Sequence, residues 1–213
     1  MLRRTRTVRR IAREIADAAD GAFESHRDGS VVEEPQVTDR ILGAIQDRIR
    51  NRRFGDIVWN ARTLRTGRGI SAEEKRHGAD LMGVLDINLY GYIVKKGFLA
   101  QAKRAEPYSV FDSRDWKRLR SQCERMLDRT PDSFVFVYSI WEGIRIFPAN
   151  AVFELGSRHI FDLYDRGVAS FFESHIQCFI GDRRLNSTSI DTLDALVELP
   201  VERVLELSAR TSE

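Results

Sequence analysis

With 213 residues, of which 42% are hydrophobic and 9% aromatic, the chain is long enough to bury a core as one domain, and wholesale disorder is excluded. No apolar run approaches the ~20 residues that span a bilayer, and the basic N-terminus lacks the apolar centre of a secretory signal. The two cysteines, Cys123 and Cys178, form neither a disulfide framework nor a metal-ligand spacing, so we expect a cytoplasmic protein.

The net charge of +2 conceals an uneven distribution along the chain. Residues 1–130 contain 27 of the 34 Lys and Arg and 19 of the 32 Asp and Glu, whereas residues 131–213 contain 7 and 13. Arg dominates the basic part, and its planar guanidinium suits contacts with phosphate. This asymmetry favours a polyanionic partner such as DNA.

Residues 1–25 predict an amphipathic helix with a basic leading end. Six arginines fall in the first thirteen positions, and apolar side chains then recur at helical spacing, namely Ile11, Ile15, Ala18, Ala19 and Phe23. Either this is a solvated, frayed terminus, or residues 1–30 form an arm that contacts DNA or docks on a partner protomer. In the DNA-binding case, Arg3, Arg4 and Arg6 contact phosphate.

A second helix is expected after residue 33, because Pro35 suits a first helical turn. Its core stripe consists of Val37, Ile41, Ala44, Ile45 and Ile49. Glu34 lies on the side that this helix buries, where it is either a partner of the helix dipole or a carboxylate directed into a site. Glu33 is the alternative acid if the helix begins at a different residue.

Residues 56–59 form a short strand-like run, and a polar basic segment follows through residue 76. We expect this segment to be a loop, and loops of that length are uncommon in compact domains unless they have a function. Arg62, Arg65 and Arg68 are therefore either solvated or in contact with nucleic acid.

Residues 77–104 are predicted to form two strands joined by a turn. Side chains alternate along a strand, so Gln101 and Lys103 share one face and Ala102 points to the other. Antiparallel pairing brings Asp80 opposite this pair. The turn is expected at residues 95–97, with 90–92 as the competing position, and its place sets the register. Asp86, six residues after Asp80 and on the same face, is the alternative acid if the turn is at 95–97.

The rest of the chain alternates helical and strand patterns. Residues 112–129 predict a helix, 133–140 a buried strand, and 144–147 a strand that follows a turn at Gly143. Gln122, on the inner half of the helix, either reaches the site as a helper residue or bridges locally. Beyond it we expect mostly helix over 149–176, a short strand over 175–180, and one or two closing helices over 193–205.

The residues Glu34, Gly78-Ala79-Asp80 and Gln101-Ala102-Lys103, in the order helix, strand, hairpin, helix, strand, resemble the PD-(D/E)xK nuclease superfamily. The Gln-x-Lys variant is similar to that of the Mrr-like restriction nucleases. The resemblance covers residues 31–140. It implies an α/β (α+β), restriction-endonuclease-like fold in which helices flank a mixed sheet, with an αβββαβ core, extra N- and C-terminal helices, and residues 141–213 as an extension of the 31–213 domain.

The resemblance further implies a Mg²⁺-dependent endonuclease that hydrolyses DNA phosphodiesters in a bacterial restriction or anti-phage system. Asp80 would bridge the metal and Glu34 would be a second ligand. The Gln101 amide oxygen and the Ala102 carbonyl would complete the protein's share, and Mn²⁺ can substitute for Mg²⁺. Lys103 would orient the attacking water and stabilise the developing charge.

Two other classes of function fit the same sequence. One is a catalytically silent nucleic-acid-binding or adaptor protein on the same fold, and the other is a structural module assembled through its terminal helices. An ordinary sheet with exposed Asp, Gln and Lys is the simplest alternative to any site. A nuclease of this size would be toxic without control, which favours a regulatory or sensor partner, or a homo-oligomer, that gates it.

Overall fold

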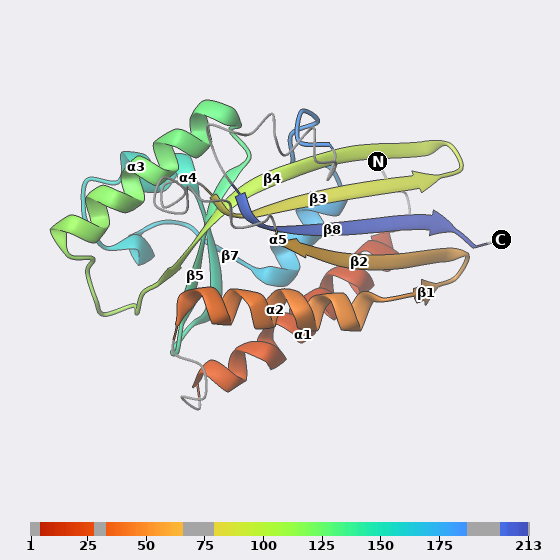
Figure 1. Ribbon diagram of the computed structural model, residues 1–213, viewed down its shortest axis with the longest axis horizontal. Helices are drawn as coiled ribbons and strands as arrows, with labels where there is room; N and C mark the ends of the chain where they lie inside the picture. The colour runs from red at the N-terminus through yellow and green to blue at the C-terminus, as the bar shows by residue number, and fades with distance from the viewer. Residues whose placement is uncertain (1–4, 28–32, 66–78, 187–200, 213) are drawn as a thin grey trace.

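The computed structural model describes residues 5–27, 33–65, 79–186 and 201–212, and its centre is one twisted, mixed sheet of eight strands (Figure 1). The strands lie in the order β1-β2-β8-β3-β4-β5-β6-β7. The predicted α/β class is therefore confirmed. The strands are β1 (Arg52–Phe54), β2 (Ile57–Arg65), β3 (Ala79–Leu89), β4 (Tyr92–Arg104), β5 (Ser133–Ser139), β6 (Gly143–Pro148), β7 (Arg166–Gly167) and β8 (Val201–Thr211).

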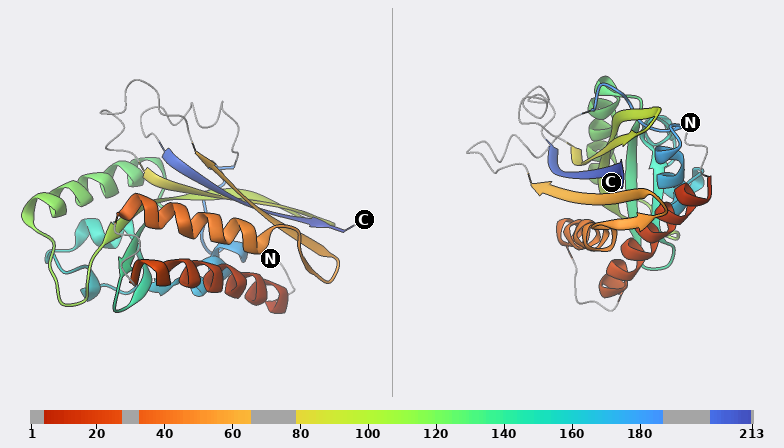
Figure 2. Two further views of the ribbon diagram at one scale, coloured as in Figure 1. Left: turned by 60° about the horizontal axis from the view of Figure 1, so that its bottom comes forward. Right: turned by 90° about the vertical axis from the view of Figure 1, so that its right-hand side faces the viewer.

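Helices cover both faces of this sheet (Figure 2). One face packs against α1 (Thr5–Arg27), α2 (Glu34–Ile49) and α5 (Val168–Ile176), and the other against α3 (Ser113–Arg129) and α4 (Ala149–Glu154). A short 3-10 helix, η2 (Ile160–Asp162), adds Ile160 to the α3 side. Among the described residues, no helix combines the length and apolar character needed to cross a membrane.

Helix α1 is part of the domain's own core. Its residues Val8, Ile11, Ile15, Ala19 and Phe23 are buried in the same cluster as the apolar face of α2. The boundary expected at residue 30 therefore does not separate two cores. The helix docks on α2 and α5 of its own chain, and this burial rather than helix propensity holds it in place.

The turn of the central hairpin lies at Tyr90–Gly91, where Gly91 has φ +72°, so the prediction of a turn at residues 95–97 is wrong. Lys96 and Gly97 are instead buried inside β4. A Cβ at Gly97 would come within 2.5 Å of the Gly83 carbonyl oxygen and 2.6 Å of that of Leu185. The glycine therefore permits a close approach of backbones rather than a turn.

The C-terminal segment corrects a second prediction, because residues 201–211 form a strand and not a closing helix; residues 193–200 of that expectation lie outside the described part of the chain. Strand β8 pairs antiparallel with β2 and parallel with β3. The chain order α2-β1-β2-β3-β4-α3-β5 follows αβββαβ apart from the short strand β1, but β8 separates β2 from β3 in space. The specific restriction-endonuclease-like core therefore stays a prediction.

Other local predictions have mixed outcomes. The helix over 112–129 is confirmed as α3, and the strands over 133–140 and 144–147 are confirmed as β5 and β6. The strand over 175–180 is wrong, since α5 runs to Ile176 and the chain then turns through Cys178 at φ 70°. The strand predicted at 56–59 extends as β2 through Arg65, so Arg62 and Arg65 lie on a strand and not in the expected loop, and residues 66–76 of that loop lie outside the described part of the chain.

Candidate active site

The start of β3 and the end of β4 lie side by side, because the two strands are antiparallel with Leu81 opposite Ala100. Asp80 therefore lies beside Gln101, one residue from the start of its strand. Gln101 and Lys103 alternate with Ala100 and Ala102, which belong to the core on the α1 side. The expected convergence of Asp80 with Gln101 and Lys103 on one face is confirmed.

Asp80 is held by two donors from β4. Its Oδ2 accepts a hydrogen bond from the backbone N–H of Ala102 at 2.8 Å and another from the side-chain amide of Gln101. Burial raises the pKa of Asp80 to about 6, and the charges of Glu34 and Glu202 act in the same direction against the opposing effect of Lys103. The folded surroundings of Asp80 therefore disfavour the ionised form of its carboxyl group.

Glu34 approaches the same place from α2. Its Oε1 lies 3.5 Å from the Lys103 ammonium, and both side chains are largely buried. Burial raises the pKa of Glu34, and the charge of Lys103 opposes that rise. Thr38 fixes this end of α2, because its hydroxyl donates to the Glu34 carbonyl oxygen and bonds the Tyr138 hydroxyl at 3.0 Å. Glu33 is exposed and caps nothing with its side chain, so Glu34 is the acid directed at the site.

Asp86, the alternative acid, lies elsewhere. It pairs in register with Lys95, and its Oδ2 is 3.3 Å from the Lys95 ammonium and 3.0 Å from the Arg210 guanidinium. Six residues along a strand correspond to about 20 Å. The turn at Tyr90–Gly91 therefore removes Asp86 from the vicinity of Lys103.

Two buried glutamines have amide oxygens without a hydrogen-bond partner among the described residues, Gln101 Oε1 and Gln122 Oε1. A buried polar atom without a partner costs about 1–3 kcal/mol, so it calls for a functional or structural reason. Gln122 lies on the buried side of α3, one helical turn beyond Arg118. Its role as a helper residue stays a prediction.

The donor set suits a hard divalent cation. Two carboxylates with raised pKa values and an unpartnered amide oxygen are oxygen ligands of the kind that Mg²⁺ prefers. In the described ranges, no three Asp, Glu, His or Cys side chains are grouped closely enough to hold a metal by themselves. Oxygens of Gln101 and Ala102 would therefore have to contribute.

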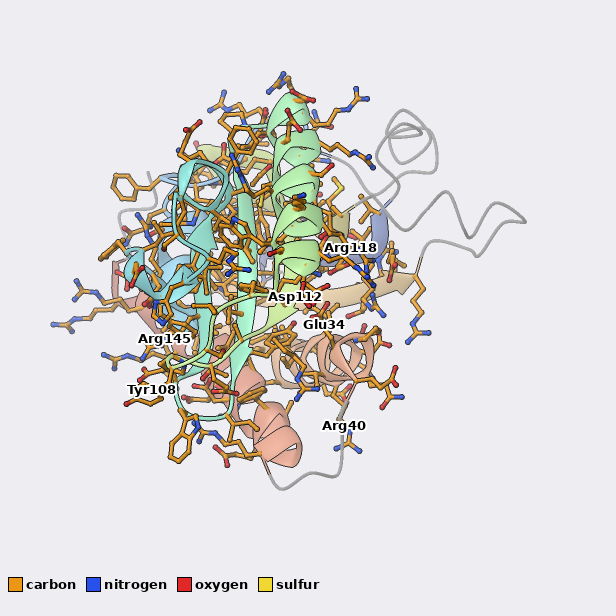
Figure 3. All side chains as sticks on the ribbon, turned by 90° about the vertical axis from the view of Figure 1, so that its left-hand side faces the viewer. Glu34, Arg40, Tyr108, Asp112, Arg118 and Arg145 are labelled. Atoms are coloured by element: carbon orange, nitrogen blue, oxygen red, sulfur yellow. The ribbon has the colours of Figure 1, made fainter. Side chains whose placement is uncertain are left out.

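A groove of about 480 Å³ opens beside these residues, between the start of α2 and the start of α3 (Figure 3). Arg118 projects into it from α3, and its charge lowers the pKa of Glu34. The sequence analysis did not single out Arg118. The available signal was its spacing from Gln122, since residues four apart share a helix face. The groove is lined by Glu34, Lys103, Arg104, Ala105, Ser109, Val110, Phe111, Asp112, Asp115 and Arg118.

Glu202 is a second residue near the site that the sequence analysis missed. Ala79 pairs with Val201 and Leu81 with Arg203, so Glu202 on β8 is the neighbour of Asp80 on the side away from Gln101. Its negative charge raises the pKa of Asp80. Glu202 was missed because residues 193–205 were predicted to be helical, whereas only the pairing of β8 with β3 places Glu202 beside Asp80.

Of the arginines proposed to bind nucleic acid, the structure describes Arg6, Arg62 and Arg65, and none of them lines the groove. Arg6 is exposed near the start of α1, and α1 and α2 run in opposite directions, so Arg6 lies at the end of the helix pair away from Glu34 (Figure 2). Arg62 pairs with Glu206 at 2.6 Å, and Arg65 pairs with Asp39. Arg3, Arg4 and Arg68 lie outside the described residues.

No protein-family model matches the chain, and neither a curated protein nor a solved structure matches it. What the site can do chemically follows from its own residues and their geometry.

Proposed function

We propose that the protein is a Mg²⁺-dependent nuclease that hydrolyses DNA phosphodiester bonds. The observation that supports this most is the convergence of Asp80, Gln101, Lys103 and Glu34 from three elements, with Glu34 and Lys103 lining one groove. Phosphodiester hydrolysis needs an attacking water and compensation of negative charge at the phosphate. Clustered carboxylates beside an ammonium are suited to both.

Asp80 and Glu34 would hold the metal with their carboxylates, and Gln101 and Ala102 would contribute an amide and a backbone oxygen. When bound, Mg²⁺ supplies a Lewis acid that neutralises phosphate charge and acidifies water. Gln101 is neutral, so the ligand set carries one negative charge fewer than it would with a carboxylate at this position. We therefore expect modest Mg²⁺ affinity and a contribution from the substrate phosphate.

Lys103 has the most direct role among the chain's own groups. Its ammonium is held beside Glu34 and next to Asp80, where it can donate a hydrogen bond to the attacking water and stabilise the charge that develops at phosphate. Asp80 is ionised above a pH of about 6, so the site is competent to bind a cation at neutral pH.

Cleavage of plasmid DNA by the purified protein, in Mg²⁺ and in EDTA, tests this proposal. We expect cutting in Mg²⁺ or Mn²⁺ that EDTA and Asp80→Asn abolish, with Asp86→Asn as the matched control on the same strand. Failure of the wild type to cut either the plasmid or single-stranded circular DNA, in either metal, would contradict the proposal. DNA binding without cutting would favour the catalytically silent binding protein instead.

The endonuclease role in a bacterial restriction or anti-phage system rests on the resemblance to Mrr-like nucleases alone. Control by a regulatory partner or by self-association is proposed on the same ground, since free activity would damage the cell.

A further inference from the structure

Two loops meet at the end of the sheet that contains the candidate site. One follows β4 and the other joins β5 to β6, and because β4 and β5 are parallel both begin at the same edge. Glu106 ties them together, since its carboxylate accepts hydrogen bonds from the Ser139 hydroxyl at 2.7 Å and the Ile140 N–H at 2.9 Å. Ser139 in turn accepts from the Glu142 N–H at 2.9 Å. The two loops therefore form one fixed surface.

This surface carries exposed apolar side chains. Tyr108 is 92% exposed and Trp141 is 73% exposed, and Val110, two residues after Tyr108, and Ile140, directly before Trp141, are also exposed. Single exposed apolar residues are ordinary, but these four fall on two loops joined by one carboxylate. Figure 3 shows Tyr108 on the same end of the molecule as Glu34 and Arg118. Rigid aromatic rings without intramolecular cover are suited to stacking.

The adjoining groove has mixed charge, because Lys103, Arg104 and Arg118 line it together with an equal number of carboxylates. Val110 lines it together with Lys103 and Arg118. Within the described ranges the Arg118 guanidinium forms no side-chain hydrogen bond or ion pair, and its charge acts on Glu34 across the groove. Asp112 and Asp115 also line the groove, but the Asp112 carboxylate accepts hydrogen bonds from two backbone N–H groups at the start of α3.

From this arrangement we infer that the ligand of the site is single-stranded nucleic acid, with bases stacked on Tyr108 and Trp141 and the backbone passing Arg118 and Lys103. The inference rests on the proposed function and names its substrate class. Proteins bind unpaired strands without sequence preference by stacking bases on aromatic side chains and placing cations along the backbone; here Lys103, Arg104 and Arg118 are the cations of the groove. In a duplex the faces of the bases are covered by their neighbours, so a duplex would not use the two rings.

Tryptophan fluorescence provides a direct test, because the chain has three tryptophans and Trp59 and Trp116 are buried. The full-length protein in EDTA is titrated with a 15-residue oligothymidine, the matching oligouridine, and a duplex of equal length. We expect quenching and saturable binding with the single strands, DNA or RNA, and weaker binding of the duplex. Trp141→Phe should lose the quenching but keep binding, since a phenyl ring still stacks.

Variants separate stacking from other effects. Trp141→Ala and Tyr108→Ala should each weaken single-strand binding by roughly 10-fold, given the usual contribution of one stacked base. Tyr90→Ala removes an equally exposed ring at the hairpin tip, remote from the site, and should leave binding unchanged. Equal affinity for the duplex, or full affinity in Trp141→Ala, would overturn the inference.

The remaining outcomes distinguish this inference from the proposed function. Plasmid cutting without single-strand binding would support the proposed nuclease activity and contradict the inference that the ligand is single-stranded. Single-strand binding without any cutting would support the ligand and contradict the nuclease. Concentration-dependent sedimentation that Trp141→Ala abolishes, with no quenching by oligonucleotides, would assign the surface to a second copy of the chain and overturn the inference.

Discussion

Lys103 on β4 and Glu34 at the start of α2 lie 3.5 Å apart between Nζ and Oε1, although 69 positions separate them in the chain. Ion pairs that retain contact with solvent contribute about 0–1 kcal/mol, so the contact is a weak source of stability. Its consequence is positional, because it directs an ammonium and a second carboxylate toward Asp80. The pair therefore provides a way to separate loss of activity from loss of fold.

Lys103→Met should abolish cleavage while the protein stays folded. The methionine keeps most of the apolar stem but removes the ammonium, so we expect a loss of at least about 100-fold in rate, as for other groups that stabilise developing charge. Glu34 and Asp80 lose the cation that opposes their raised pKa values, so the unfolding free energy should fall by about 1–3 kcal/mol at pH 8, which leaves the protein folded. Initial cleavage rates and urea unfolding measure the two effects.

Lys95→Met is the matched control for this variant. Lys95 lies on the same strand and pairs with Asp86 instead of Glu34. Its rate should equal that of the wild type, and an equal loss in both variants would contradict a specific role for Lys103.

Mg²⁺ affinity should depend on pH through Asp80. Because the pKa of Asp80 is about 6 in the free protein, protons compete with the cation below that value. Competition with one proton weakens the apparent affinity about tenfold for each pH unit below 6 and has little effect above 7. Calorimetric titration with Mg²⁺ between pH 5 and pH 8 measures this, and affinity that is flat across the range would exclude Asp80 as a ligand.

Asp80→Asn should stabilise the fold at high pH. The folded pKa of about 6 exceeds the ordinary value of 3.8, so the folded state binds the proton more tightly and the stability contribution falls as pH rises from about 4 to 6. Removing the charge should therefore raise the unfolding free energy by roughly 1–3 kcal/mol at pH 8 and by little at pH 4. Urea unfolding at the two pH values gives the difference.

Asp86→Asn serves as the comparison for that gain. Asp86 has two cationic partners, Lys95 and Arg210, so its loss should be neutral or mildly destabilising at pH 8. Added Mg²⁺ should stabilise Asp86→Asn and the wild type, but not Asp80→Asn, because only a protein that binds the cation gains from it.

The local parts of the site could be predicted from the sequence. Alternation along a strand places Gln101 and Lys103 on one face, and Pro35 marks the helix that presents Glu34. Both inferences depend on residues that are near one another in the chain. The same holds for α3 and β5, whose periodic or continuous apolar patterns are long enough to be distinctive.

The non-local parts could not be predicted in the same way. Gly97 indicates a turn by its residue type, but it is glycine because the Gly83 and Leu185 carbonyl oxygens approach it closely. Residues 203–205 are buried in succession on both faces of the sheet, so Val204 and Leu205 break the simple alternation of a strand. Glu202 and Arg118 reach the site only through the pairing and packing that follow from these features.

Arg118→Ala should weaken nucleic-acid binding and lower its salt dependence. A guanidinium that neutralises one phosphate releases about one counterion, so the slope of log affinity against log salt should fall by about 1. Lys117→Ala is the charge-matched control, since Lys117 is exposed on α3 and does not line the groove. Equal slopes in the two variants would assign the effect to net charge and not to the groove.

Leu205→Ala should strongly destabilise the protein, because β8 is an interior strand of the sheet and not an edge strand. Leu205 is buried between β2 and β3, with Thr63 and Gly83 as its partners. Truncation of a buried leucine costs about 2–5 kcal/mol, whereas Thr211→Ala at the exposed end of the same strand should change stability by less than about 0.5 kcal/mol. Urea unfolding compares the two variants. Hydrogen exchange adds a second measurement, since the amides of β8 should be as well protected as those of β3. Rapid exchange there, or a small loss in Leu205→Ala, would contradict the interposed strand and with it the place of Glu202 beside Asp80.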